Sequence, residues 1–391
     1  MSTVVPLKLS EFNISDCTGF LIEDPLERLP EPFEVWHKLA KSLPELVKKG
    51  VFRDAVDELP ILDSSVLKDE RQQRLAHLQL SVIASGYVWQ DENVPKKLPV
   101  CVAIPLWNVS ETLGVKPVVS HPGLFLANWQ RKDTSELPSL SNMRCLYSLP
   151  GGEDADWFLI ITNAVELEFA PALKCIVNGA YSMDIGDMDG LASELIGIRD
   201  ALVNMKETFT NIHDKVSPAA FYNDLRPFLG GWGKEGSALP DGLLFEGVSD
   251  VPVKCIGDTG AQTSIFACLD AFLGIQHSQP ESKTFLLLMK DYMVREHRMF
   301  VEALEKRPST REFVVSSCDE KLKGAYNDCL TAAADFRSFH IQVVAKYIVS
   351  MANKDQQDSK EKSEDKGTGG TNVMPFLKGL RTETKDSVIT K

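Results

Sequence analysis

One long helical stretch, residues 325–349, constrains what this chain can fold into more than any other part of the sequence. Its apolar side chains recur at helical spacing and form one stripe: Tyr326, Cys329, Leu330, Ala333, Phe336, Val343, Val344 and Tyr347. His340 lies in this stripe, four residues after Phe336 and four residues before Val344. We therefore expect the imidazole of His340 to point into the core of a helical protein.

Two interpretations of His340 are open from this pattern. A histidine on an apolar helix face is most often a core side chain whose polar atoms are satisfied by its neighbours. The sharper interpretation is an axial ligand to a haem iron, which requires a neutral imidazole held in an apolar wall. Helical spacing does not choose between the two.

The charge balance and the cysteines exclude several classes of protein. Lysine and arginine number 42 against 55 aspartate and glutamate, so the net charge is −13 and attracts neither nucleic acid nor anionic membranes. The eight cysteines are scattered without a CxxC pair, so we expect reduced thiols and no zinc or disulfide framework. No apolar run reaches membrane-spanning length, and the first residues lack a signal-peptide core, so we expect a cytoplasmic protein.

The chain of 391 residues is long enough to divide into two domains. A hydrophilic stretch at 130–142 and a turn-rich stretch at 150–154 predict the boundary near residue 150. Residues 1–150 then form a small domain that is mainly helical with little strand. Residues 151–391 form a large all-α domain, because helical patterns follow one another there with short connections.

The pattern also predicts individual elements. In the small domain we expect two short helices, Phe33–Lys41 and Ser42–Gly50, and extended chain at 100–106 and 118–122. In the large domain the predicted helices are 157–180, 188–212, 217–229, 261–273, 283–305, 309–316 and 320–350. The stretch after Asn353 is charged and lacks apolar periodicity, so a mobile loop is expected at about 353–371. Apolar residues return at 373–380 and predict one more helix that folds back.

The order of several short motifs resembles the indoleamine 2,3-dioxygenase family. The helix Leu330–Tyr347, with the sequence RSFH at 337–340, is similar to the proximal-ligand helix of that family. The other matching motifs are LDSSVL at 62–67, RLAHLQLSVIASGYVWQ at 74–90, PAAFYNDLRPFLGGWG at 218–233, DGLLFEG at 241–247, GDTGAQTSIF at 257–266 and KGTGGT at 366–371. Each motif is weak alone, but their order and spacing are specific and cover nearly the whole chain.

The resemblance implies a haem-dependent dioxygenase. Such an enzyme inserts both atoms of O₂ across the indole C2–C3 bond of L-tryptophan, forms N-formylkynurenine and acts in tryptophan catabolism through the kynurenine pathway. It would carry one haem b per chain, with His340 as the only protein ligand to the iron. The implied partners are L-tryptophan, related indoleamines and O₂, and the implied state is a monomer. No catalytic acid or base is implied, and the sequence shows no obvious one.

The resemblance also assigns residues to the substrate. Phe221 would pack on the indole ring and Arg226 would bind the carboxylate, a task that suits the planar guanidinium. Arg226 precedes Pro227, so we expect it where a helix ends or kinks. By default Phe221 is a core residue and Arg226 caps a helix end or faces water. Thr368 would contact the amino-acid end of the substrate, although composition alone makes 367–371 a linker.

Other residues would shape the pocket and hold the cofactor. Phe158 and Thr162 match distal-pocket positions, and Thr259 matches a serine beside the haem propionates. The two threonines each add a methyl group to the family's serine, and His121 replaces a tyrosine, so the shape of the pocket differs from that of better-known members. Arg337 is expected to be partly buried and to need a partner, either Asp270 or a haem propionate. The remaining histidines, at 37, 77, 213, 277 and 297, are interpreted as surface or structural residues.

Two other function classes stay open. Some molluscan myoglobins belong to the same family, so the chain could be an oxygen-binding haem protein with little or no tryptophan turnover. That function would keep His340 without selecting Phe221, Arg226 or Thr368, and the presence of all three favours the enzyme. A haem-free signalling or scaffold protein is the third alternative.

Overall fold

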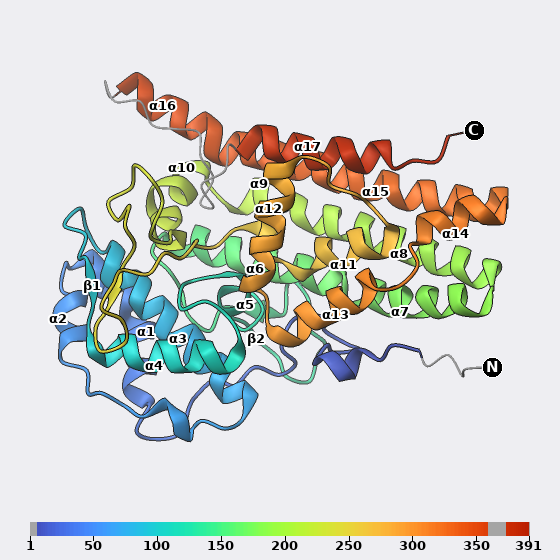
Figure 1. Cartoon of the computed structure of the whole chain (residues 1–391). Helices are drawn as coiled ribbons and strands as arrows, with labels where there is room; N and C mark the ends of the chain where they lie inside the picture. Colours follow the sequence, from blue (N-terminus) through green and yellow to red (C-terminus); the bar gives the residue numbers. More distant parts are fainter. Residues whose placement is uncertain (1–5, 359–372, 391) are drawn as a thin grey trace.

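The central helix of the molecule is the one that the apolar stripe predicts. The computed structural model describes residues 6–358 and 373–390, and in it α15 spans Glu320–Val344. Asp319 caps its start by accepting a hydrogen bond from the backbone N–H of Leu322 (2.8 Å). The helix packs against α8 (Met188–Thr210) and against the C-terminal helix α17 (Val373–Asp386), which lies along it in Figure 1.

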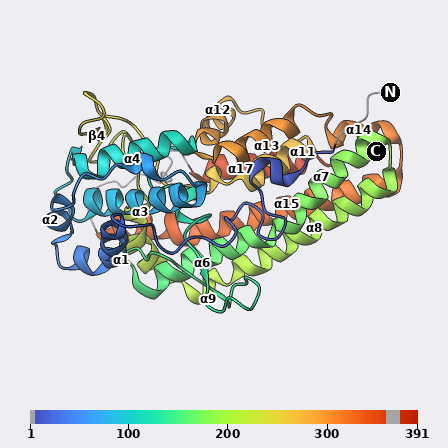
Figure 2. The ribbon, with the colours of Figure 1, turned by 90° about the horizontal axis from the view of Figure 1, so that it is seen from below.

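The first part of the chain is helical with little strand, as predicted. Its helices are α1 (Glu34–Lys48), α2 (Phe52–Asp57), α3 (Glu70–Trp89), α4 (Val100–Leu113) and α5 (His121–Leu124). The strands are two residues long: β1 (Lys97–Leu98) pairs in parallel with β4 (Leu244–Phe245), and β2 (Gln130–Arg131) pairs antiparallel with β3 (Met143–Arg144). Figures 1 and 2 both show α1, α2 and α4 at the opposite end of the molecule from α7 (Ala170–Ile185) and α14 (Thr310–Ser317).

Two predictions in this part were wrong, and both concern a proline that lies inside a helix. The expected pair of helices around Ser42 is the single helix α1, which continues through Pro44. The stretch 100–106, expected to be extended, belongs to α4 and contains Pro105. An interior proline costs a hydrogen bond and a steric clash, about 3 kcal/mol. Both helices bury much of their length, including Trp36 and Leu106, and this apolar packing offsets the cost.

The rest of the chain is mostly helical, apart from one long stretch at 230–259 that contains β4 and no helix. Its remaining helices are α6 (Gly152–Glu168), α9 (Ile212–Lys215), α10 (Pro218–Ala220), α11 (Ser264–Leu273), α12 (Pro280–Met289), α13 (Arg295–Glu305) and α16 (Ser350–Asp358). The predicted helix 157–180 is divided at Phe169, just before Pro171, into α6 and α7. The predicted helix 283–305 is likewise divided into α12 and α13 by the turn Lys290–Tyr292. The fold class is the predicted all-α one.

Two hydrophobic cores hold these helices together. The first contains α1, α3 and α4 but also residues of α6 and Tyr347, so it reaches both sides of position 150. The second contains α7, α8, α11, α13 and the first half of α15, together with the N-terminal residues Leu9–Leu21. The domain boundary near residue 150 stays a prediction. No helix in the described parts of the chain is long and apolar enough to cross a membrane.

The C-terminal region fits the sequence interpretation in part. The predicted helix at 373–380 is present as α17 and extends to Asp386. Through the π-helical segment Ala345–Val349, α15 continues into α16, so the charged stretch is helical as far as Asp358. The remainder of the expected mobile loop, including Thr368, falls within 359–372 and lies outside the described residues.

Candidate functional site

A cavity of about 700 Å³ lies between α6, α8, α11, α12, α15 and α17. Its wall is mostly apolar and is rich in phenylalanine, with Phe158, Phe221 and Phe266 among its residues. Every predicted site residue within the described chain lines it; they are Phe158, Thr162, Phe221, Arg226, Thr259, Asp270, Arg337 and His340. The fold therefore brings together side chains that are up to 182 positions apart (340 − 158) in the sequence.

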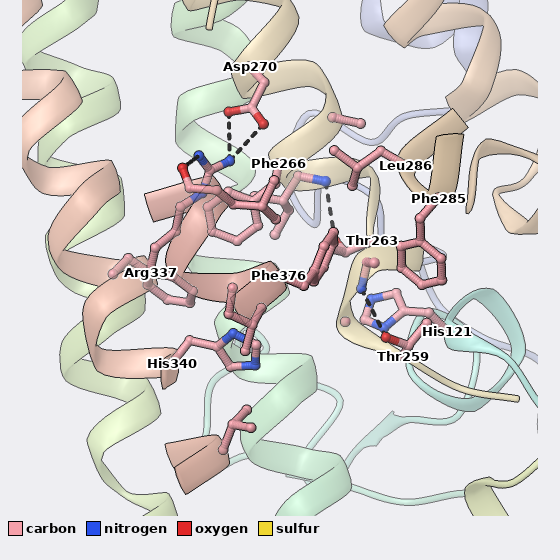
Figure 3. Close-up of a pocket in the computed structure, with 18 of the residues that line it drawn as sticks. His121, Thr259, Thr263, Phe266, Asp270, Phe285, Leu286, Arg337, His340 and Phe376 are labelled. Atoms are coloured by element: carbon pink, nitrogen blue, oxygen red, sulfur yellow. Dashed lines mark hydrogen bonds and ion pairs between the residues drawn. The ribbon is translucent and has the colours of Figure 1, made fainter. Parts of the chain in front are cut away.

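His340 presents its imidazole to this cavity from one face of α15 (Figure 3). Its ring lies beside that of Phe209, with 6.3 Å between the centroids. The side chain is only partly covered by neighbours because it faces the cavity, yet burial within the protein lowers its pKa to about 4. The imidazole is therefore neutral near pH 7 and keeps a lone pair for a Lewis acid.

A change of helix type places Arg226 on the same wall. The turn Phe221–Leu225 is wound as a π-helix, and the next turn, Arg226–Leu229, is a tighter 3₁₀-helix that contains Pro227. Arg226 was predicted where a helix ends or kinks, and the helix changes its winding at Arg226 and ends at Leu229. The guanidinium carbon lies 5.0 Å from the centre of the Tyr222 ring, and burial lowers the arginine pKa from its ordinary value.

The aromatic side of the cavity is a series of touching rings. Phe221 is 4.8 Å from Phe158 and 6.0 Å from Tyr347, measured between centroids. Thr162 stands one helical turn after Phe158, and its hydroxyl donates to the Phe158 carbonyl oxygen (2.9 Å). Its hydroxyl is thus used within α6, so we expect its methyl group to matter most for the shape of the cavity.

Another part of the cavity wall is charged. Arg337 of α15 holds both carboxylate oxygens of Asp270 at 2.7 Å, so of the two partners expected for this arginine the structure shows Asp270 (Figure 3). Burial alone would raise the pKa of Asp270, but Arg337 and the neighbouring His277 lower it below its ordinary value. Thr259 lies on the wall as the residue that caps the turn Gly260–Gln262.

A further polar cluster on the wall was not found from the sequence. His121 Nε2 is 2.7 Å from Glu166 Oε1, and the Thr263 hydroxyl donates to the same oxygen at 2.6 Å. Burial alone would lower the pKa of His121, but Glu166 raises it. Burial raises the pKa of Asp258 to about 6. The charge of Asp258 also raises the pKa of His121. The spacing of Phe158, Thr162 and Glu166, one turn apart on one face of α6, is the signal that could have revealed Glu166.

Comparisons with known proteins identify relatives that match nearly the whole chain. The sequence model described as indoleamine 2,3-dioxygenase matches residues 8–387. Human indoleamine 2,3-dioxygenase 2 is 38% identical over 100% of this chain and 97% of its own length. A myoglobin of Haliotis madaka is 41% identical over 97% of this chain and 98% of its own. A 6-hydroxytryptophan 2,3-dioxygenase of Fusarium equiseti is 30% identical over 97% and 98%.

Proposed function

Because this chain belongs to the indoleamine 2,3-dioxygenase family, we propose that it is a haem-dependent dioxygenase that cleaves the indole C2–C3 bond of L-tryptophan with O₂ and forms N-formylkynurenine. The observation that carries this proposal is one cavity that has a neutral histidine, a set of phenylalanine rings and a half-buried arginine on its wall. Haem b, one per chain, would supply the iron that activates O₂.

The residues present fit a haem. Within residues 6–358 and 373–390, no three His, Cys, Asp or Glu side chains gather to hold a bare metal ion. A haem iron takes four ligands from the porphyrin and needs only one from the protein, and His340 is a neutral imidazole on the apolar wall. The aromatic and aliphatic lining suits the apolar porphyrin faces. We propose that Thr259 and the Arg337–Asp270 pair lie toward its carboxylates.

The substrate would be held from the side of Phe221. We propose that Phe221 and Phe158 flank the indole ring and that Arg226 binds the carboxylate in a bidentate manner. Thr368, which lies outside the described residues, would contact the amino-acid end of the substrate. The indole ring is electron-rich, so the reaction as proposed needs no protein group to remove a proton. The work of the chain is then to orient the substrate and exclude water.

The second candidate is an oxygen-binding haem protein, favoured by the 41% identity to a molluscan myoglobin. It would use His340 in the same way but would have no need for Arg226 and Phe221 on the same cavity wall. The test is turnover of L-tryptophan by the reduced, haem-loaded protein, followed at the N-formylkynurenine absorbance. Product formation supports the dioxygenase. Reversible O₂ binding without product would replace it with the oxygen carrier.

We also propose that the protein acts in the cytoplasm as a monomer. All eight cysteines are free, which suits a reducing compartment. The names of the relatives give indoleamines and 6-hydroxytryptophan as the substrates of those proteins. Because the family is shared, we propose L-tryptophan and related indoleamines as the substrates of this chain.

A further inference from the structure

The C-terminal helix α17 forms one wall of the cavity. Val373, Phe376, Leu377 and Leu380 line the cavity from this helix, and Phe376 meets Phe285 of α12 with 5.3 Å between ring centroids (Figure 3). Leu380 is buried, but most of α17 is only partly covered. The position of α17 therefore depends on particular anchoring contacts as well as on apolar packing.

One anchor passes through His277, which lies in the turn between α11 and α12. Its Nε2 atom is 2.8 Å from Asp270 of α11, and its Nδ1 atom is 2.8 Å from Glu383 of α17. Glu383 also accepts hydrogen bonds from the backbone N–H (2.7 Å) and the hydroxyl (2.8 Å) of Ser278. The imidazole thus bridges two carboxylates that belong to different helices.

Only the protonated form of His277 can make both of these contacts. A neutral imidazole has one N–H donor and one acceptor nitrogen, whereas the imidazolium has two donors. If His277 loses its proton, one nitrogen lone pair faces a carboxylate oxygen, and that contact becomes repulsive. The charges also balance in the protonated form, with His277 and Arg337 against Asp270 and Glu383.

We propose that His277 is a positioning residue whose protonated ring fastens α17 against the cavity, so that retention of the group bound in the cavity depends on pH. The anchoring of α17 by His277 is supported by the geometry of His277, Asp270 and Glu383 alone. The pH-dependent retention of haem rests on the function proposed above.

The direction of the pH dependence follows from the surroundings of His277. Burial and Arg337 of α15 lower its pKa, but Asp270 of α11 and Glu383 of α17 outweigh them, and the pKa is raised. Lys283 of α12 lines the same cavity. A raised histidine pKa means that the stabilisation is full below the ordinary histidine pKa and is lost as the pH rises through the raised value. The carboxylates have lowered pKa values, so acid removes the anchor only below their ordinary range.

Other anchors of α17 involve no histidine. Arg337 donates to the carbonyl oxygen of Leu380 (3.3 Å) and to the hydroxyl of Thr384. Near the end of the chain, Asn327 donates to the Ile389 carbonyl (3.1 Å) and Arg311 to that of Ser387. Loss of the His277 anchor should therefore loosen α17 without detaching it.

Hydrogen exchange of α17 tests the anchor without any cofactor. In the apo protein, after correction for the intrinsic rate, we expect the amides of 376–386 to exchange about threefold to tenfold faster at about pH 8.5 than at about pH 6.5. His277→Gln and Glu383→Gln should show fast exchange at both pH values. His213→Gln, which changes a histidine outside this cluster, should respond to pH as the wild type does. An equal exchange rate at both pH values in the wild type, or an unchanged response in His277→Gln, would overturn the proposal.

The transfer of haem to an excess of apomyoglobin tests the link to the cofactor. Wild type should release haem several-fold faster at the higher pH, and His277→Gln should release it at the faster rate at both. A chain that binds no haem would refute the proposed function and leave the exchange result to decide the anchor. If the rate of haem release does not depend on pH while the hydrogen exchange of α17 does, the anchor is supported and its effect on the cofactor is refuted.

Discussion

His340 and His277 line the same cavity, yet their surroundings change the pKa of the two imidazoles in opposite directions. Burial acts alone on His340 and lowers its pKa to about 4. At His277 two carboxylates outweigh burial, and the pKa is raised. An imidazole surrounded by apolar groups stays neutral and can act as a ligand, whereas one held between carboxylates becomes a cation that joins helices. The apolar and charged ends of the cavity therefore suit different tasks.

The largest expected effect comes from removing the imidazole at the apolar end. His340→Ala should lose haem during purification, because the proposed iron–histidine bond is the only one from the protein. The ratio of haem to protein and the Soret band measure this loss. His213→Ala is the matched control, since that histidine lies outside the cavity wall and should leave both values unchanged. If His340→Ala keeps full haem occupancy and an unchanged Soret band, His340 is not the ligand to the iron.

At the charged end, the effect should appear in stability. Asp270→Asn leaves the Arg337 guanidinium buried, with 9% of its side chain exposed, and without a charged partner on that side. Breaking a buried pair in this way costs about 3–5 kcal/mol of unfolding free energy. Urea unfolding at about pH 7 measures it, and Asp189→Asn, which removes an exposed pair with Lys321, should change little. Equal stability of Asp270→Asn and wild type would show that the ion pair does not hold this end together.

Arg226→Ala should affect turnover more than structure. Loss of a charge-assisted bidentate contact costs on the order of 2–4 kcal/mol, or roughly 30-fold to 1000-fold in kcat/KM for L-tryptophan. Haem content and helicity should remain, because the proposed partner of Arg226 is the substrate. Steady-state kinetics with L-tryptophan and circular dichroism separate these effects. If Arg226→Ala keeps the wild-type kcat/KM, the substrate carboxylate binds elsewhere on the cavity wall.

The smallest effect is expected at Thr162. Its hydroxyl donates to the Phe158 carbonyl within α6, so Thr162→Val should keep the shape of the wall and change kcat/KM by less than about threefold. Thr162→Ala, which also removes the methyl group, is the companion variant for shape. A tenfold loss in Thr162→Val alone would mean that the hydroxyl acts on the substrate.

The sequence was most informative where chemistry and periodicity coincide. The stripe around His340 predicted both the longest described helix and the side chain that faces the cavity. Arg337 was expected to need a partner, either Asp270 or a haem propionate, and the structure shows Asp270. Both predictions needed only the helical spacing of 325–349 and one physical requirement, which was an apolar surrounding for His340 and a charged partner for Arg337.

The misses have physical reasons too. Pro44 and Pro105 lie inside helices because burial of their neighbours outweighs a local penalty, and this burial depends on contacts that a single segment does not contain. Glu383 lies 106 positions after His277, so the bridge between them could not be inferred from local patterns. His277 was interpreted as a surface or structural histidine, and the structure shows a structural one on the cavity wall, in contact with Asp270 and Glu383.

The most direct test of the central claim is the fate of ¹⁸O₂. The reduced, haem-loaded protein is mixed with L-tryptophan under ¹⁸O₂, and the product is analysed by mass spectrometry. The account predicts N-formylkynurenine that carries two ¹⁸O atoms, in wild type but not in His340→Ala. A protein that binds and releases ¹⁸O₂ while L-tryptophan stays intact would contradict the dioxygenase.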